Sequence, residues 1–343
     1  MKLVIGTDEA GYGPNLGPLT ITATGWMLED HVDHENLYSH FSSVFCRAGE
    51  KEDRIQVGDS KTMFRPSGGL GSLEHSVLAL CLPGYQCHAA GVPVQLIDSS
   101  WSELLDYLLV QPRSDFVLPW YKKFNPGLPV EANVEDLGRK TLQVKKWLEE
   151  PIAEYGATKQ LPHFRQISDV IEPAEFNKGC EQHGNKASLL SAKTLQLAVN
   201  LSKLFLENST LAERVSDVFV ICDKHGGRNR YAGILQSFFP DCWVEVVEES
   251  GPYSQYRFDH HGRQFVFRFL AKGESQLPVA YASMISKYLR EVSMKAFNSF
   301  WVARVKGLQP TAGYPLDARR FRTQVEGHIT KLGLEESQWW RAR

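Results

Sequence analysis

The chain has 343 residues, of which 43% are hydrophobic and 23% are charged, and its formal net charge is -2. These values are ordinary for globular proteins and argue against a disordered or membrane-embedded chain. The length allows one large α/β domain or a domain with a sizeable insertion. The absence of an overall positive charge argues against nonspecific coating of nucleic acid, although it permits a local basic groove.

The expected elements are two runs of strands, each followed by a helix, as judged from hydrophobic periodicity and turn residues. In chain order they are strands at residues 2–7 and 19–26, a helix at 188–207, strands at 218–222, 243–248, 255–259 and 264–270, and a helix at 278–304. The first two strands are joined by a segment rich in glycine and proline. Such an arrangement predicts an α/β layer fold.

Residues 85–161 do not fit this arrangement. They contain many prolines, several aromatic residues and the basic pairs Lys122-Lys123 and Lys145-Lys146. We predict that they form an insertion or small subdomain, which interrupts a single domain built from residues 1–84 and 162–343.

The start of the chain gives no sign of export. Met1 is followed at once by a strand-like apolar run, which leaves no room for a signal peptide, and no later run is apolar enough to span a bilayer. The six cysteines show neither a CxxC pair nor the spacing of a zinc site. We therefore expect a cytoplasmic monomer with reduced thiols and no membrane partner.

An acidic pair, Asp8 and Glu9, follows the first predicted strand. Hydrolysis of a phosphodiester can use two divalent ions about 3.5 to 4 Å apart, and hard ions of this kind prefer carboxylate ligands. Taken alone, such a pair is more often a solvated turn. The nearby Gly11 and Gly13 favour a functional site, because they leave main-chain amides open to a sugar-phosphate backbone.

The segment from Ile5 to Pro18, Ile-Gly-Thr-Asp-Glu-Ala-Gly-Tyr-Gly-Pro-Asn-Leu-Gly-Pro, resembles the opening of ribonucleases HII and HIII, the type 2 ribonuclease H family. Further family motifs have counterparts in the same order. They are Asp59-Ser60-Lys61, Asn185 at the start of a helix, Asp223 at the end of a strand, Lys272-Gly-Glu-Ser275 with Ala282–Lys287, and Ala312-Gly-Tyr314-Pro. The resemblance implies a ribonuclease H-like mixed sheet flanked by helices, with a C-terminal helical region.

The resemblance also implies a set of catalytic metal ligands. They would be Asp8, Glu9, Asp223 and Glu274. Glu291 is the alternative fourth carboxylate, and it falls where the family has a later aspartate that is not usually a metal ligand. His225 could protonate a leaving group or hold a phosphate, although a solvated loop histidine is the favoured interpretation.

By the same resemblance, Gly11, Tyr12 and Gly13 would recognise the ribose at the cut, and Tyr314 would stack on the next deoxyribose. Ser60, Lys61 and Asn185 would also bind substrate. The implied activity is a metal-dependent endonuclease that hydrolyses the RNA strand of an RNA/DNA hybrid, or a ribonucleotide-containing duplex. It would use two Mg²⁺ or Mn²⁺ ions and leave 5′-phosphate and 3′-hydroxyl ends.

This sequence departs from the family at Tyr12, where ribonuclease HII usually has arginine. Cleavage at single embedded ribonucleotides and the choice between the HII and HIII subfamilies therefore stay open. Two other functions also stay open. One is a structure-specific DNA nuclease on the same fold, and the other is a catalytically weak relative that binds hybrids.

Overall fold

The centre of the protein is a mixed β-sheet. In this computed structural model the described residues are 1–50, 53–64, 68–88, 99–111, 118–149, 164–207 and 212–342. The seven strands of the sheet lie in the order β5-β2-β1-β6-β9-β8-β7, and β3 and β4 form a separate small sheet. The strands are β1 Lys2–Ala10, β2 Leu19–Leu28, β3 Phe45–Arg47, β4 Ile55–Val57, β5 Phe164–Ile171, β6 Asp217–Asp223, β7 Glu245–Glu249, β8 Tyr253–His260 and β9 Arg263–Leu270.

The strand directions bring the ends of β1 and β6 together. β2 is antiparallel to both β1 and β5, whereas β1, β6 and β9 are mutually parallel. Thr7 of β1 pairs with Cys222 of β6, so Asp8 and Asp223 follow at neighbouring positions on the same edge of the sheet. β7 and β8 extend the sheet beyond β9 as an antiparallel meander.

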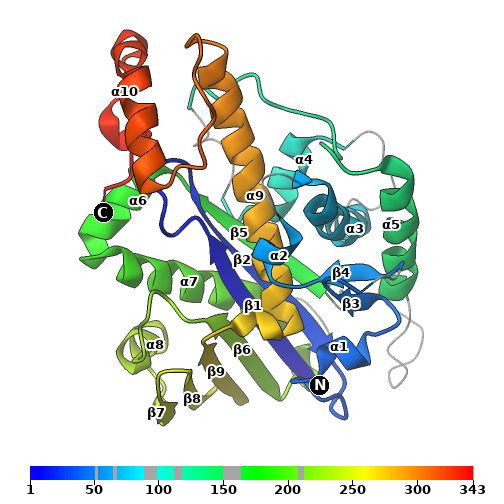
Figure 1. Ribbon diagram of the computed structural model, residues 1–343. Coiled ribbons are helices and arrows are strands. Elements are labelled where there is room, and N and C mark those ends of the chain that lie inside the picture. The colour runs from blue at the N-terminus through cyan, green and yellow to red at the C-terminus, as the bar shows by residue number, and fades with distance from the viewer. Residues whose placement is uncertain are drawn as a thin grey trace.

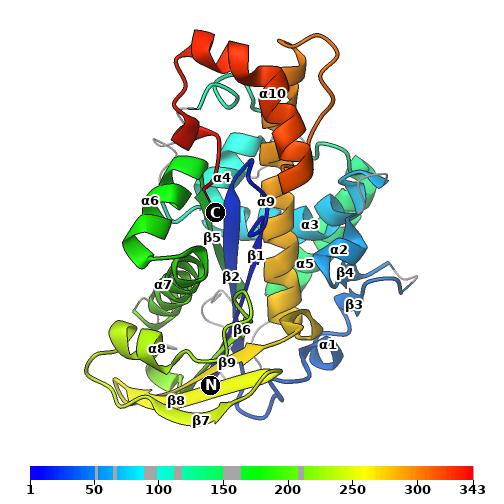
Figure 2. The same cartoon turned by 60° about the vertical axis from the view of Figure 1, so that its left-hand side comes forward.

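Helices cover both faces of the sheet. Figure 2 shows α9, α3 and α5 on one side and α6, α7 and α8 on the other, and α9 crosses the sheet in Figure 1. The helices are α1 Leu37–His40, α2 Ser60–Met63, α3 Gly71–His88, α4 Trp101–Leu108, α5 Val134–Glu149, α6 Pro173–His183, α7 Lys186–Leu206, α8 Ala232–Phe238, α9 Leu277–Val302 and α10 Pro315–Leu332, with short 3-10 turns η5 Ala212–Arg214, η6 Gly273–Ser275 and η7 Glu336–Gln338.

Side chains of β1 alternate between two hydrophobic cores. Val4 belongs to the core beneath α9, α3 and α5, whereas Leu3 and Ile5 belong to the core beneath α6 and α7. This alternation is the period of two that a strand buried on both faces requires. A third cluster joins the end of α9 to α10 through Trp301 and Phe321.

Close packing at Gly6 fixes α9 on the sheet. A Cβ atom at Gly6 would lie 2.3 Å from the carbonyl carbon of Pro278, so no larger residue fits there without displacing the helix. The hydroxyl of Thr24 donates a hydrogen bond to the carbonyl oxygen of Pro278 over 2.8 Å. The first turn of α9 therefore lies against the centre of the sheet, and η6, just before it, reaches the edge where β1 and β6 end.

The segment predicted as an insertion contributes α4 and α5, which lie within its described part. Trp101 of α4 and Trp147 of α5 belong to the same hydrophobic core as Trp26 of β2. Glu74 of α3 is fully buried and accepts hydrogen bonds from the amides of residues 130, 131 and 132 at 2.6 to 2.8 Å. This carboxylate thus anchors part of the segment to the rest of the protein.

The predicted fold class, a mixed sheet flanked by helices with a C-terminal helical region, is confirmed. Every strand and helix that the sequence predicted is present, although β1 extends to Ala10 and so includes the acidic pair. Strands β3 to β5, helices α1 to α6 and helix α8 were not predicted. α3 crosses the proposed boundary at residue 85, and the division at 85 and 161 stays a prediction. No helix in the described ranges is long and apolar enough to cross a membrane.

Candidate active site

Four carboxylates from three segments of the chain meet at one edge of the sheet. Asp8 and Glu9 lie at the end of β1, and Asp223 is the last residue of β6. Glu274 lies in η6. The first residue of this turn is Gly273, and its amide donates a hydrogen bond to the Asp223 carboxylate over 2.9 Å. The parallel pairing of β1 with β6 and this hydrogen bond therefore assemble the group.

The four groups influence one another electrostatically. Burial raises the pKa of Asp8, and the negative charges of Glu9 and Asp223 raise it further. Burial likewise raises the pKa of Glu9 to about 7, with contributions from Asp223 and Glu274. Burial is also the main cause of the raised pKa values of Asp223 and Glu274. Like charges this close oppose one another, so a bound cation would stabilise their ionised forms.

The chemistry of this cluster fits a hard divalent cation. Carboxylate oxygens are the ligands that Mg²⁺ and Mn²⁺ prefer. As the side chains stand, no group of three His, Cys, Asp or Glu residues in the described ranges is close enough to hold an ion. The four carboxylates nevertheless supply the oxygen donors that such an ion prefers.

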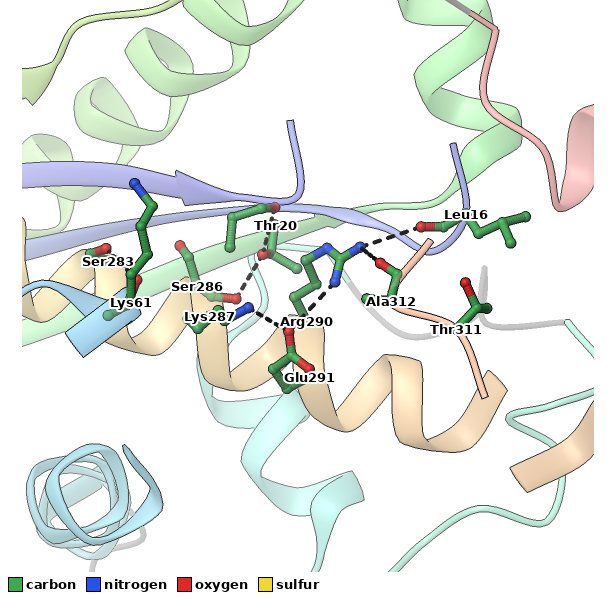
Figure 3. A network of polar contacts seen from close by, with 12 residues as sticks. Leu16, Thr20, Lys61, Ser283, Ser286, Lys287, Arg290, Glu291, Thr311 and Ala312 are labelled. Atoms are coloured by element: carbon green, nitrogen blue, oxygen red, sulfur yellow. Dashed lines mark hydrogen bonds and ion pairs between the residues drawn. The ribbon is translucent and has the colours of Figure 1, made fainter. Parts of the chain in front are cut away.

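The geometry distinguishes the two candidates for the fourth carboxylate. Glu291 is on α9, where its carboxylate lies 2.6 Å from the ammonium of Lys287 and 3.6 Å from the guanidinium of Arg290 (Figure 3). Glu274 instead interacts with Glu9 and Asp223. Glu291 has cationic partners of its own, so the arrangement favours Glu274 as the ligand.

The Asp59-Ser60-Lys61 motif lies beside the carboxylates. The positive charge of Lys61 lowers the pKa values of Asp223 and Glu274, and its side chain extends from α2 past Ser283 in Figure 3. The hydroxyls of Ser60 and Ser283 are 3.0 Å apart. A hydrogen bond with Ser283 lowers the pKa of Asp8, so this serine of α9 is a site residue that the sequence analysis did not single out.

A network of buried hydrogen bonds holds the main chain at Asp8. The hydroxyl of Ser286 lies 3.0 Å from the Asp8 carbonyl oxygen and 2.9 Å from the Thr22 hydroxyl. The hydroxyl of Thr20 donates to the carbonyl oxygen of Ser286 over 2.7 Å (Figure 3). These contacts join α9 to β1 and β2 directly behind the acidic pair.

Two loops lie beside the carboxylate cluster. Gly11 has φ +88°, which favours glycine, and Gly13 is close to the second loop, since a Cβ atom there would lie 4.0 Å from the Tyr314 ring. Tyr314 is 56% exposed, so its ring is available to a ligand. Tyr12 is half-buried, and the Lys186 ammonium lies 4.7 Å from the centre of its ring.

Asn185 directly precedes Lys186, the residue that contacts the Tyr12 ring. It is the N-cap of α7, and its side chain accepts a hydrogen bond from the Ser188 amide over 2.9 Å. Arg228 donates to the Ser188 hydroxyl, also over 2.9 Å. Lys186 at the start of α7 and Arg228 in the loop after β6 therefore lie near Tyr12, which belongs to the loop of residues 11–17, called here the glycine loop.

The interpretation of His225 as a solvated loop residue is wrong. Only 1% of it is exposed, and its Nδ1 atom lies 3.0 Å from the Ser191 hydroxyl. Burial lowers its pKa to about 3, so the imidazole is neutral near pH 7. A neutral, buried ring cannot reach a leaving group, and its polar contact with Ser191 is structural.

The fold and site together define an α/β protein with an acidic cluster where parallel strands end. No family model and no curated protein matches the sequence. Among solved structures, the chain is similar to one in the PCNA:RNase HII complex from Archaeoglobus fulgidus, with 12% identity over 99% of this chain and 94% of that chain and a TM-score of 0.40. The chain is also similar to ribonuclease H2 from Pyrococcus horikoshii OT3, with 14% identity over 98% of this chain and 92% of that chain and a TM-score of 0.41.

Ribonuclease HIII structures also match. A point mutant of Bst-RNase HIII is 14% identical over 98% of this chain and 65% of that chain, with a TM-score of 0.43. The same enzyme in complex with Mn²⁺ gives a TM-score of 0.40. These are distant likenesses, so the activity has to be inferred from the residues of this chain.

Proposed function

We propose that this protein is a metal-dependent endonuclease that hydrolyses the RNA strand of RNA/DNA hybrids, acts as a monomer, and leaves 5′-phosphate and 3′-hydroxyl ends. The observation that carries the proposal is the meeting of Asp8, Glu9, Asp223 and Glu274, all with raised pKa values, at one edge of the sheet. Buried like charges are costly to a fold and are typical of sites that bind a cation.

These carboxylates would hold two Mg²⁺ or Mn²⁺ ions. When bound, such ions activate water and stabilise the charge on the attacking and leaving oxygens of a phosphodiester. Lys61 places a positive charge beside Asp223 and Glu274, where it would attract the phosphate group to be cut. Ser283 and Ser286 would keep Asp8 in position through its side chain and its carbonyl oxygen.

Recognition of RNA would use the two loops beside the cluster. The main chain of Gly11, Tyr12 and Gly13 would contact the ribose 2′-hydroxyl, which is the group that distinguishes RNA from DNA. The exposed ring of Tyr314, close to Gly13, would stack on the sugar that follows the cut. Ser60, Asn185 and the cations Lys186 and Arg228 would hold the phosphate backbone on either side.

The test is a cleavage assay with three labelled substrates: an RNA/DNA hybrid, a DNA duplex with one ribonucleotide, and an all-DNA duplex. Each is incubated with the full chain in Mg²⁺, in Mn²⁺ and in EDTA. We expect metal-dependent cutting of the hybrid, and we expect the Asp8→Asn and Asp223→Asn variants to lose it. Hybrid cleavage that survives both substitutions would refute the proposed site.

The same assay, with a branched all-DNA substrate added, addresses the other functions. Cutting of branched all-DNA substrates with no cutting of hybrids would favour a structure-specific DNA nuclease. Tight binding of hybrids without turnover in either metal would favour a binding protein. Mapping the ends of any product, by their ability to be ligated, tests the 5′-phosphate and 3′-hydroxyl chemistry.

A further inference from the structure

The end of the chain docks beneath the glycine loop. The amide of Arg341 donates to the carbonyl oxygen of Asn15 over 2.8 Å, and the Asn15 side chain donates back to the Arg341 carbonyl over 3.1 Å. On the other side, Asn177 of α6 bonds to the carbonyl of Trp340 and to the amide of Ala342, at 2.9 and 2.6 Å. Residues 340–342, called here the tail, therefore lie between α6 and the loop.

The side chain of Arg341 reaches the loop itself. Its Nη2 atom donates to the carbonyl oxygen of Gly11 over 2.6 Å, and the residue is only 1% exposed. Its guanidinium carbon lies 4.7 Å from the centre of the Phe176 ring, a cation–π contact. A buried arginine that makes these contacts acts on the loop from within the protein, because it is too deeply buried to meet a ligand directly.

A second buried arginine joins the two loops of the site. Arg290 of α9 is 3% exposed, and its Nη2 atom donates to the carbonyl of Ala312 over 3.0 Å, next to the Leu16 carbonyl at 3.4 Å (Figure 3). A Cβ atom at Gly11 would lie 2.4 Å from its Nε atom. Arg290 therefore fills the space behind Gly11 and sets the distance from the glycine loop to the Tyr314 loop.

The two arginines are close enough to disfavour one another. Burial lowers the pKa of Arg341, and the positive charge of Arg290 lowers it further, whereas Glu172 opposes both effects. A pair of buried like charges is unfavourable for stability alone, and replacing such groups by apolar residues often stabilises a protein. Their contacts with the loop carbonyls indicate a role in arranging the loops.

The geometry points to Arg341 as a positioning residue: the C-terminal tail holds the Gly11 carbonyl and thereby fixes the glycine loop against the carboxylate cluster. This inference rests on the proposed function in so far as the loop reads the ribose. Without Arg341 the loop would lose its anchor below Gly11 but keep its covalent neighbours and the contacts of Asn15. The duplex would still bind, whereas the ribose at the cut would be poorly aligned.

Four forms of the full chain test this: wild type, Arg341→Gln, Arg341→Lys and Arg322→Gln. Arg322 is a matched control, because it pairs with Glu336 over 2.7 Å and lies 5.0 Å from the Trp340 ring but belongs to α10 and not to the tail. Losing it removes one contact at the start of the tail and leaves the bonds of Arg341 to Gly11 and Asn15 in place. The lysine variant keeps one charged donor near that carbonyl.

Hydrogen–deuterium exchange of the backbone amides in residues 11–17 measures how firmly the loop is held, whether or not the protein cuts hybrids. We expect faster exchange there in Arg341→Gln, an intermediate rate in Arg341→Lys, and the wild-type rate in Arg322→Gln. Equal exchange in Arg341→Gln and wild type would overturn the inference. Equal acceleration in Arg341→Gln and Arg322→Gln would also overturn it, since the effect would then be general loosening of the tail.

Kinetics on the RNA/DNA hybrid then separate alignment from binding. We expect kcat of Arg341→Gln to fall on the order of tenfold, the size expected for one charged hydrogen bond, with little change in KM. Arg341→Lys should recover part of the loss, and Arg322→Gln should retain the wild-type kcat. A wild type that cuts no hybrid contradicts the proposed function, whereas wild-type kcat in a correctly folded Arg341→Gln contradicts only the positioning role.

Discussion

The amide of Gly273 donates a hydrogen bond to the carboxylate of Asp223 over 2.9 Å, and this bond joins two parts of the site that lie 50 residues apart in the chain. The intervening residues form α8 and strands β7, β8 and β9. β9 returns parallel to β6, with Leu270 paired to Asp223, so the chain arrives at η6 beside the residue it left. Strands β7, β8 and β9 thus widen the sheet without separating Asp223 from Glu274.

The two candidates for the fourth carboxylate give a direct comparison. We expect Glu274→Gln to lower hybrid cleavage by roughly a hundredfold or more, because it removes the charge of a proposed metal ligand beside Asp223. Glu291→Gln should change it only a few-fold, because that carboxylate is paired with Lys287. Single-turnover rates in Mg²⁺ and Mn²⁺ measure both. The reverse order of effects would assign the metal role to Glu291.

A divalent ion should stabilise the protein in the absence of nucleic acid. An ion that binds only the folded state at a hundred times its dissociation constant adds about 2.7 kcal/mol to the free energy of unfolding. We expect Mn²⁺ to raise Tm by a few degrees in the wild type and to have little effect on Asp8→Asn. In EDTA, Asp8→Asn should melt no lower than the wild type, since it removes a buried repulsive charge. An equal Mn²⁺ shift in both proteins would argue against the site.

Glu74 should be a major determinant of stability. Its carboxylate accepts hydrogen bonds from the backbone amides of residues 130, 131 and 132. It also accepts one from the Tyr288 hydroxyl over 2.7 Å. Glu74→Ala leaves these donors without their acceptor, and we expect a loss of about 3 to 5 kcal/mol in the free energy of unfolding. Tyr288→Phe removes only one bond and should cost about 1 kcal/mol. Urea unfolding measures both, and similar losses in the two variants would contradict this view.

The titration of Glu172 predicts a pH dependence of stability. Burial raises its pKa from 4.5 to about 7. Between these values the folded state binds more protons than the unfolded state, so the contribution of this group to stability falls as the pH rises from about 4.5 to about 7. Glu172→Gln keeps an acceptor for the Tyr121 hydroxyl and removes the titration.

We therefore expect Glu172→Gln to gain stability over the wild type between pH 4.5 and pH 7, by at most about 3 kcal/mol, the value that corresponds to this pKa shift. The free energies of unfolding of the two proteins are compared by urea titration at several pH values. Their difference cancels the contributions of other titrating groups. A difference that is constant with pH would show that Glu172 has the same pKa in the folded and unfolded states, and would contradict this prediction.

The sequence by itself determined the fold class and the candidate carboxylates. Strands such as β1 and β6 are marked by continuous apolar runs, because both their faces are buried, and turn residues mark where they end. Asp8, Glu9 and Asp223 stand at those strand ends, and the resemblance to a known family implied that they form one site with Glu274. Lys61 and Tyr314 followed from motif order, and the structure places Lys61 beside the carboxylates and Tyr314 beside Gly13.

Only the tertiary structure decided which distant groups support the site. The sequence around Arg341 does not predict its role, because its contact with Gly11 joins residues 330 positions apart in the chain. The position of Glu274 beside Asp223 likewise depends on β9 returning the chain to the end of β6, and the burial of His225 depends on the packing of α7. Strand and helix periodicity are local properties of a chain, whereas burial, ion pairing and pKa arise from contacts that exist only after folding.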